Sequence, residues 1–254
     1  MAFAEPPGWY VISLRPQGGH AALRRAAAAQ GARLIALSPW RVAARGDDRT
    51  RQALALALSA PRILFTSPNA VRAAAALLPL ALARESDQVW IAVGSGTAAA
   101  LRKAGIDEVV FPSRMDSEGL LALPSLQALA GTRVGLVTAP EGRETLLPAL
   151  RQHGADVLRA DVYARKPVAL SARALRKLRT LDAPAALALS SGGALKRLLD
   201  SAPTDVLERL RSQPVVAASA RLRELAREAG FAEVELAEGP LPTQLIAAMA
   251  RRFR

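Results

Sequence analysis

The chain has 254 residues, 51% of them hydrophobic, and this length can bury one large core or two cores of roughly 110 to 130 residues each. It contains no cysteine and only two histidines, so disulfides, thiolate nucleophiles, cysteine-ligated metal centres and a histidine-rich metal site are excluded. The formal net charge of +12 favours an anionic partner, although arginine spread through an alanine-rich sequence is also typical of a GC-rich genome.

Short apolar runs alternate with longer amphipathic segments rich in alanine and leucine along the chain. This alternation is typical of parallel sheets flanked by helices, so the expected fold class is α/β. In chain order, the expected strands are Tyr10–Leu14, Arg33–Leu37, Arg62–Phe65, Val89–Val93, Glu108–Phe111, Arg133–Val137, Asp156–Ala160, Ala186–Leu189, Pro214–Ala218 and Glu233–Leu236. Expected helices, most of them ending at a glycine, include Ala21–Gln30, Pro68–Leu78, Gly96–Ala104, Thr145–His153 and Arg221–Ala229.

Two polar-flanked segments, Ser38–Ala44 and Asp161–Val168, are expected to be extended connectors.

The start of the chain lacks the basic-then-apolar layout of a signal peptide. The longest uncharged stretch, Ala73–Ala83, is shorter than the roughly 18 to 20 residues that span a bilayer. We therefore expect a soluble, cytoplasmic protein without membrane contact. The two histidines, His20 and His153, are expected at the surface or at helix ends.

Three blocks of sequence occur twice in the same order. The segment from Val11 to Trp40 matches the segment from Val134 to Tyr163 at an offset of 123, Leu64–Val71 matches Ala188–Leu195 at 124, and residues 92–111 match residues 217–236 at 125. A glycine-alanine before a strand is common to many βα units, but three blocks in register favour an internal duplication.

Several expected strands end in small or polar residues just before a helix. These loops are at Leu14–Pro16, Phe65–Asn69, Val93–Thr97, Pro140–Arg143, Ser190–Gly193 and Ser219–Arg221. The carboxyl ends of parallel strands share one edge of a sheet, where helix N-termini offer unpaired N–H groups and a partial positive charge. We expect an anion to bind there, unless these residues serve only as helix caps.

Common nucleotide and hydrolase motifs are absent. Gly94-Ser95-Gly96 lacks the third glycine of a dinucleotide fingerprint, and the sequence contains neither GxxxxGK[ST] nor GxSxG. Nucleic-acid binding is also disfavoured, because aromatic residues make up only 4% of the chain and no long basic run occurs.

The sequence resembles the uroporphyrinogen-III synthase family. The resemblance covers essentially the whole chain, and the motifs that carry it are LRP at Leu14–Pro16, FTSPNAV at Phe65–Val71, VGSGTAAAL at Val93–Leu101, FPSRMDSEGLLAL at Phe111–Leu123, APEGRETL at Ala139–Leu146 and VY at Val162–Tyr163. It implies two α/β lobes, each with a parallel sheet flanked by helices, joined by two extended strands, with the substrate in the cleft between the lobes. One lobe would consist of 1–38 and 168–254, the other of 42–164, with 38–44 and 161–168 as connectors.

The resemblance further implies that hydroxymethylbilane, a linear tetrapyrrole with eight carboxylates, is cyclised to uroporphyrinogen III in heme and siroheme biosynthesis. The last ring is inverted through a spirocyclic intermediate and water is released. The family needs no cofactor and no metal. We expect a monomer with a small-molecule substrate and a transient contact with hydroxymethylbilane synthase, the preceding enzyme.

By the same resemblance, Tyr163 corresponds to the family's tyrosine and is the candidate general acid, with a packing role as the alternative. The candidate substrate-binding residues combine loop hydroxyls and amides with arginines, whose forked guanidinium suits carboxylates. They are Arg15, Thr66, Ser67, Asn69, Ser95, Thr97, Arg143, Ser190, Ser191, Ser219 and Arg221. Where many members have a G-x-x-T-A pattern, this chain has Ser219-Ala220-Arg221, so the threonine and glycine contacts there do not transfer.

Two other functions remain open from the sequence. A two-lobed protein that binds an anionic metabolite without chemistry would have the same basic charge, and so would a regulatory domain associated with nucleic acid.

Overall fold

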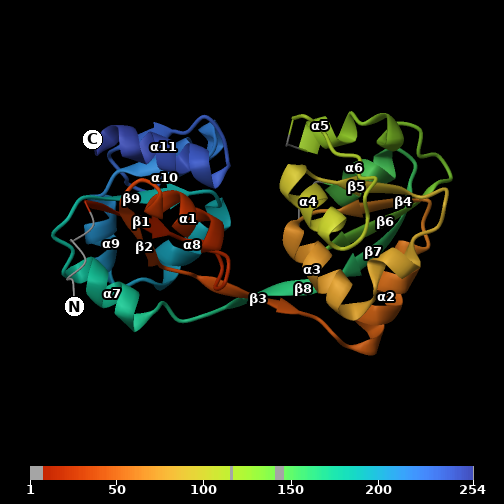
Figure 1. The fold of residues 1–254 in the computed structure, drawn as a ribbon, viewed down its shortest axis with the longest axis horizontal. Coiled ribbons are helices and arrows are strands. Elements are labelled where there is room, and N and C mark those ends of the chain that lie inside the picture. The colour runs from red at the N-terminus through yellow and green to blue at the C-terminus, as the bar shows by residue number, and fades with distance from the viewer. Residues whose placement is uncertain (1–7, 115–116, 141–145, 254) are drawn as a thin grey trace. The chain divides into compact units, whose positions relative to one another are not determined.

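The computed structural model, drawn in Figure 1, describes residues 8–114, 117–140 and 146–253. Its described helices and strands form an α/β fold with two parallel sheets, each flanked by helices. The predicted fold class is therefore confirmed.

The chain divides into two compact units. The first consists of Met1–Arg41 and Lys166–Arg254, and the second consists of Val42–Arg165. The divisions fall within two strands, β3 (Trp40–Ala44) and β8 (Tyr163–Pro167), which pair with each other.

The first unit has a five-stranded parallel sheet in the order β11-β10-β9-β1-β2. Its strands are β1 (Trp9–Ser13), β2 (Ala32–Ala36), β9 (Ala185–Leu189), β10 (Val215–Ala217) and β11 (Val234–Leu236). Its helices are α1 (Ala21–Ala28), α7 (Ala172–Arg179), α8 (Gly192–Ser201), α9 (Thr204–Arg211), α10 (Ala220–Glu228) and α11 (Pro242–Arg252).

The second unit has a four-stranded parallel sheet in the order β5-β4-β6-β7. Its strands are β4 (Arg62–Phe65), β5 (Val89–Ala92), β6 (Arg133–Thr138) and β7 (Asp156–Asp161). Its described α-helices are α2 (Asp48–Leu58), α3 (Pro68–Leu77), α4 (Ser95–Lys103), α5 (Ser117–Leu121) and α6 (Leu146–Gln152), with short 3-10 turns at Leu80–Ala83 and Pro124–Leu126.

The two sheets have the same strand order when the chain is shifted by the offsets of the sequence repeat. Strands β2, β1, β9, β10 and β11 correspond to β7, β6, β4, β5 and the bridging residue Val110. The register corresponds as well, because Val11 pairs with Ala186 and the equivalent Val134 pairs with Arg62. Each unit therefore combines the first βαβ segment of one repeat with the later strands of the other, which supports the predicted duplication.

Each sheet is covered with apolar side chains on both faces, as expected for parallel strands. In the first unit, Ile12 and Leu187 pack in one core cluster, while Val11 and Ala186 pack in the cluster on the opposite face. The second unit has the same two-layer arrangement around β4 and β6. Alternate strand residues thus point into different cores, which fixes the register of every strand.

Most of the predicted strands and helices are confirmed to within two residues at each end, but the strand predicted at Glu108–Phe111 is wrong. Only Val110 pairs there, through backbone hydrogen bonds with Trp90 and Ala92 on β5. The segment lies at the sheet edge, where Val110 is 40% exposed, and the following Pro112 has no N–H to extend the ladder.

Gly135 on β6 allows helix α2 to pack directly on the sheet of the second unit. A Cβ atom at this position would lie 1.9 Å from the backbone oxygen of Ala57 on α2. No side chain fits at that distance, so the close packing of α2 against β6 requires glycine.

The Gly135→Ala substitution should therefore lower the free energy of unfolding by about 3 kcal/mol, because α2 must move away from β6. Urea denaturation followed by circular dichroism measures this change. Gly46→Ala is the matched control, since a Cβ there would meet only Leu77 at an ordinary distance of 3.8 Å. Equal stability of the two variants would contradict the proposed role of Gly135.

Candidate functional site

Polar loops of the second unit meet at the carboxyl edge of its sheet. β4 lies between β5 and β6. The Thr66 N–H donates to the Val137 carbonyl at 3.2 Å, and the Val93 N–H donates to the Phe65 carbonyl at 3.1 Å. The loops after these strands consequently lie side by side, and helices α3 and α4 begin next to each other.

Ser67 and Tyr163 form a hydroxyl pair at this edge. Ser67 Oγ accepts the Ala70 N–H at 3.0 Å as the N-cap of α3, and it lies 3.0 Å from Tyr163 Oη. The Tyr163 side chain is buried in the core of the second unit. Either hydroxyl can donate to the other, so one hydroxyl proton of the pair remains for a ligand.

The other predicted residues of this unit differ in their accessibility. Thr66 and Thr97 are buried, and Thr66 Oγ1 donates to Thr138 Oγ1 at 2.8 Å. Asn69 is half-buried and its Oδ1 accepts from Arg72 at 2.5 Å, whereas Ser95 is exposed in the first turn of α4. Ser67, Asn69 and Ser95 are therefore the more accessible members of the set, and Arg143 lies outside the described residues.

In the first unit, serines begin two helices at the equivalent edge. Ser191 accepts the Ala194 N–H as the N-cap of α8, and Ser219 accepts the Leu222 N–H as the N-cap of α10. Ser190 precedes α8 and is exposed. These two helix N-termini carry a partial positive charge that favours an anion.

Arg221 adds a full charge at the start of α8. Its Nη1 atom lies 3.9 Å from the position that a Cβ would take on Gly192. Arg221 is exposed, so its guanidinium is accessible next to the Ser191 cap. In the same unit, the Trp40 ring lies 3.5 Å from the Cβ position of Gly193.

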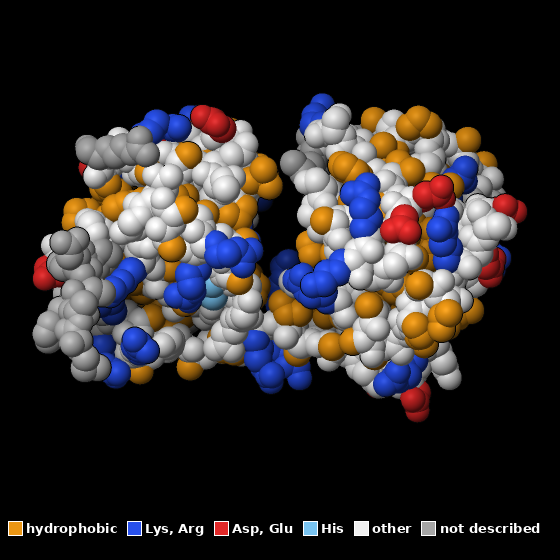
Figure 2. Space-filling view, viewed as in Figure 1, with side chains coloured by type: hydrophobic (Ala, Val, Ile, Leu, Met, Phe, Trp, Pro, Cys, Tyr) orange, Lys and Arg blue, Asp and Glu red, His pale blue; other side chains and the backbone are white. Residues whose placement is uncertain are grey.

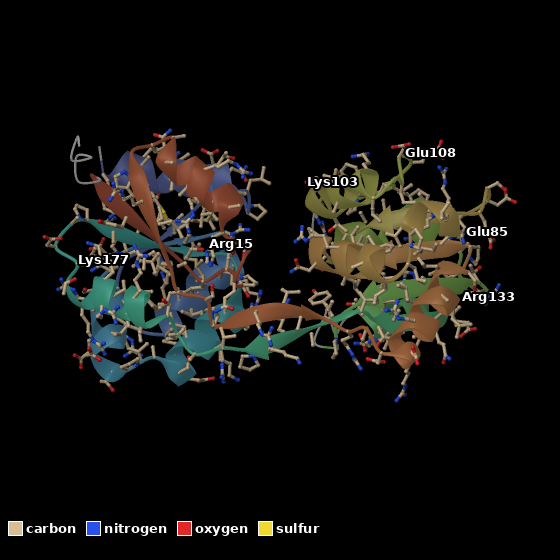
Figure 3. The ribbon with its side chains drawn as sticks, turned by 60° about the horizontal axis from the view of Figure 1, so that its bottom comes forward. Arg15, Glu85, Lys103, Glu108, Arg133 and Lys177 are labelled. Atoms are coloured by element: carbon tan, nitrogen blue, oxygen red, sulfur yellow. The ribbon has the colours of Figure 1, made fainter. Side chains whose placement is uncertain are left out.

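Arg15, labelled in Figure 3, follows β1. His20 precedes α1 in the same loop. His20 is buried, with Nδ1 3.0 Å from Ser13 Oγ and Nε2 2.8 Å from Ser38 Oγ. Burial lowers the pKa of His20 below its ordinary value, and the charges of Arg24 and Arg15 lower it further. Burial also lowers the pKa of Arg15, which stays cationic at neutral pH.

The sequence placed His20 at a helix end correctly but did not predict its burial. The only local signal is Ser13, a polar residue within an apolar strand. The contact with Ser38 forms only when β1 and β2 pair, so the local sequence pattern does not predict it.

Among residues 8–114, 117–140 and 146–253, no group of three or more His, Asp or Glu side chains is placed to hold a metal ion. No helix in the described part of the chain is long and apolar enough to cross a membrane. Figure 2 shows Lys and Arg in separate groups on the visible face of both units rather than in one continuous stripe.

The family model for uroporphyrinogen-III synthase HemD matches residues 21–247. The chain belongs to the uroporphyrinogen-III synthase family. The resemblance inferred from the sequence motifs is thereby confirmed.

Curated members of the uroporphyrinogen-III synthase family align with part of the chain. The protein from Salmonella typhimurium is 34% identical over 154 residues, and the protein from Escherichia coli is 29% identical over 151 residues. Each alignment covers 59% of this chain and 61% of the relative.

Solved structures of the family share the fold over nearly the full chain. A mutant uroporphyrinogen III synthase from the extremely thermophilic bacterium Thermus thermophilus has a TM-score of 0.60 at 21% identity, with 96% of this chain and 99% of that chain covered. The synthase from Helicobacter pylori has a TM-score of 0.63 at 16% identity, with the same coverage. These likenesses concern the fold.

The lowered pKa of His20 predicts a pH-dependent stability. As the pH falls below about 6.5, the ordinary pKa of histidine, the unfolded chain takes up a proton that the folded chain does not, and unfolding becomes easier. His20→Asn should flatten this dependence in urea denaturation between about pH 5.5 and pH 8. An unchanged slope in the variant would show that another group causes the dependence.

Proposed function

We propose that this chain converts hydroxymethylbilane into uroporphyrinogen III and water, as a carbon–oxygen lyase of tetrapyrrole biosynthesis. The observation that carries the proposal is the family match over residues 21–247. The two curated relatives carry the name uroporphyrinogen-III synthase, although the alignments span 61% of their length.

The accessible loop groups are suited to a substrate with eight carboxylates. Ser191 and Ser219 begin helices whose N-termini favour negative charge, and Arg221 adds a guanidinium beside one of them. In the other unit, Ser67 and Ser95 lie at the starts of α3 and α4. In this proposal these groups hold the bilane by its carboxylates, together with Arg15, Asn69 and Ser190.

Holding the substrate is the main catalytic task in this proposal. A free bilane closes at its unsubstituted end to the symmetric isomer, so the enzyme must fix the two ends in the geometry that favours attack through the substituted carbon of the last ring. The spirocyclic intermediate then fragments and recloses with that ring inverted. Thr66 and Thr97, which are buried, would support the loops rather than touch the substrate.

The Ser67–Tyr163 pair is the proposed proton donor. The leaving hydroxyl departs as water after it receives a proton, and the donor recovers a proton when the last pyrrole regains its aromaticity, so no net acid is consumed. Tyr163 is only 3% exposed, whereas Ser67 is half-buried. We therefore assign the contact with the substrate to this hydrogen-bonded pair as a unit.

The proposal also includes the finer expectations from the sequence. It includes a cytoplasmic monomer, a transient contact with hydroxymethylbilane synthase and the lobe boundaries at 1–38, 42–164 and 168–254. Arg143 is kept as a carboxylate ligand on the motif alone.

The proposed reaction can be tested with freshly made hydroxymethylbilane. Chain added in catalytic amounts should give uroporphyrinogen III, whereas buffer alone gives the type I isomer, and chromatography separates the two. Folded chain that yields only type I would contradict the proposal. If that chain still binds the bilane tightly, the non-catalytic binding protein becomes the better explanation.

Substitutions in the hydroxyl pair should separate proton donation from positioning. Tyr163→Phe should lower kcat about 100-fold, the scale of a lost general acid, while the remaining product stays type III. Ser67→Ala should lower kcat about 10-fold or more and also remove a helix cap worth about 1 kcal/mol. A full rate in Tyr163→Phe would limit the tyrosine to packing.

Ser171→Ala is the control for the loss of a cap alone. Ser171 accepts the Ala174 N–H as the N-cap of α7 and is not among the proposed site residues. It should lose stability like Ser67→Ala but keep the parent kcat. A similar loss of kcat in both serine variants would assign the effect of Ser67 to folding.

A further inference from the structure

The outer edge of strand β2 borders a groove in the first unit. β2 is the last strand of its sheet and pairs with β1. All five residues of Ala32–Ala36 line this groove, whose volume is about 910 Å³. Successive side chains of a strand point to opposite faces, so a groove lined by all five runs along the strand edge.

Backbone groups of β2 face this groove. The Leu37 N–H donates to the Ser13 carbonyl on the inner side at 2.9 Å. In a parallel ladder, alternate residues direct their N–H and C=O groups to opposite sides, so those of Leu34 and Ala36 point away from β1. Such an edge can pair with an added extended segment.

The groove is strongly basic. Its lining includes Arg24 on α1, Arg33 on β2, and Arg173, Arg176 and Lys177 on α7, and no Asp or Glu is among the described residues that line it. Within the described part of the chain, none of these five cations forms an ion pair.

The basic residues of α7 have different partners depending on whether they line the groove. Arg179, which does not line the groove, pairs with Asp205 on α9 at 2.6 Å. Lys177, labelled in Figure 3, extends toward Tyr10, with Nζ 4.7 Å from the ring centroid. The groove thus combines unneutralised charge with an aromatic ring and apolar strand residues.

The second unit packs its equivalent helix more extensively on the sheet. Its α2 packs along both β6 and β7, whereas the equivalent α7 contacts β2 over only a short stretch. The position of Gly135, where α2 touches the sheet, is occupied by Ile12 in the first unit. A helix cannot approach this larger side chain as closely as α2 approaches Gly135, which favours an open space beside β2.

We propose that this groove binds an acidic, extended peptide segment of a partner protein, which adds to β2 as a sixth strand. Its backbone pairs with Leu34 and Ala36, and its carboxylates reach Arg24, Arg33 and Arg176. None of the predicted substrate-binding residues that the structure describes lines the groove, so this interaction is separate from the proposed reaction.

A fluorescent seven-residue peptide of alternating glutamate and valine tests the proposal on the full chain by anisotropy. We expect saturable binding that Arg24→Glu/Arg176→Glu weakens at least 10-fold. Arg25→Glu/Lys196→Glu is the matched control, because it makes the same charge change at exposed positions outside the groove and should weaken binding less than twofold.

A second peptide tests backbone pairing without altering the protein. The same sequence with N-methyl groups on alternate amides keeps its charge but cannot form one side of the ladder, and it should bind at least 10-fold more weakly. Equal binding of both peptides would overturn strand addition. Equal weakening by the control variant would overturn a localised site.

Two further measurements address other occupants. Tricarballylate that displaces the peptide at equimolar concentration would assign the groove to a small polycarboxylate and overturn the proposal. Sedimentation that shows a dimer, broken by Arg24→Glu/Arg176→Glu, would assign it to a second copy of this chain. A monomeric chain whose peptide binding is unaffected by tricarballylate would support the peptide as the occupant of the groove.

Discussion

Both units depend on the ladder that joins the first strand of one repeat to a later strand of the other. β1 pairs with β9 in the first unit, and β6 pairs with β4 in the second. Because these strands are buried on both faces, loss of the ladder would expose two strand edges and two apolar surfaces together. The exchange of the first βαβ segments is therefore stabilised by backbone pairing and burial at the centre of each sheet.

The same ladder determines which side chains meet at the proposed site. Ser67 follows β4 and Tyr163 follows β7, and β6 between them brings the two hydroxyls to 3.0 Å although they are 96 residues apart. At the equivalent place in the first unit, the Trp40 indole lies against Gly193. The proposed bilane has one ring to invert, and two chemically identical units could not distinguish its ends.

The sequence predicted most strands because each is a short apolar run. It predicted the helix ends because glycines such as Gly31 and Gly154 adopt a positive φ there, and both signals are local. It failed at Glu108–Phe111, where pairing depends on the position at the sheet edge. It also missed the burial of His20, whose serine partners are 7 and 18 residues away. The sequence motifs identified Tyr163 and Ser67 as separate candidates. They did not predict that the two hydroxyls form a hydrogen bond, because that contact depends on the tertiary structure.

The groove beside β2 is a clearer example of a feature that the sequence pattern does not predict. Gly135 and Ile12 occupy equivalent strand positions, but the sequence does not show which helix packs on each of them. Their sizes have opposite effects on the covering helix, because a Cβ at Gly135 would lie 1.9 Å from the Ala57 carbonyl. A helix therefore could not approach Ile12 as closely as α2 approaches Gly135. In the first unit, α7 contacts β2 over only a short stretch, and the basic groove lies along the outer edge of that strand.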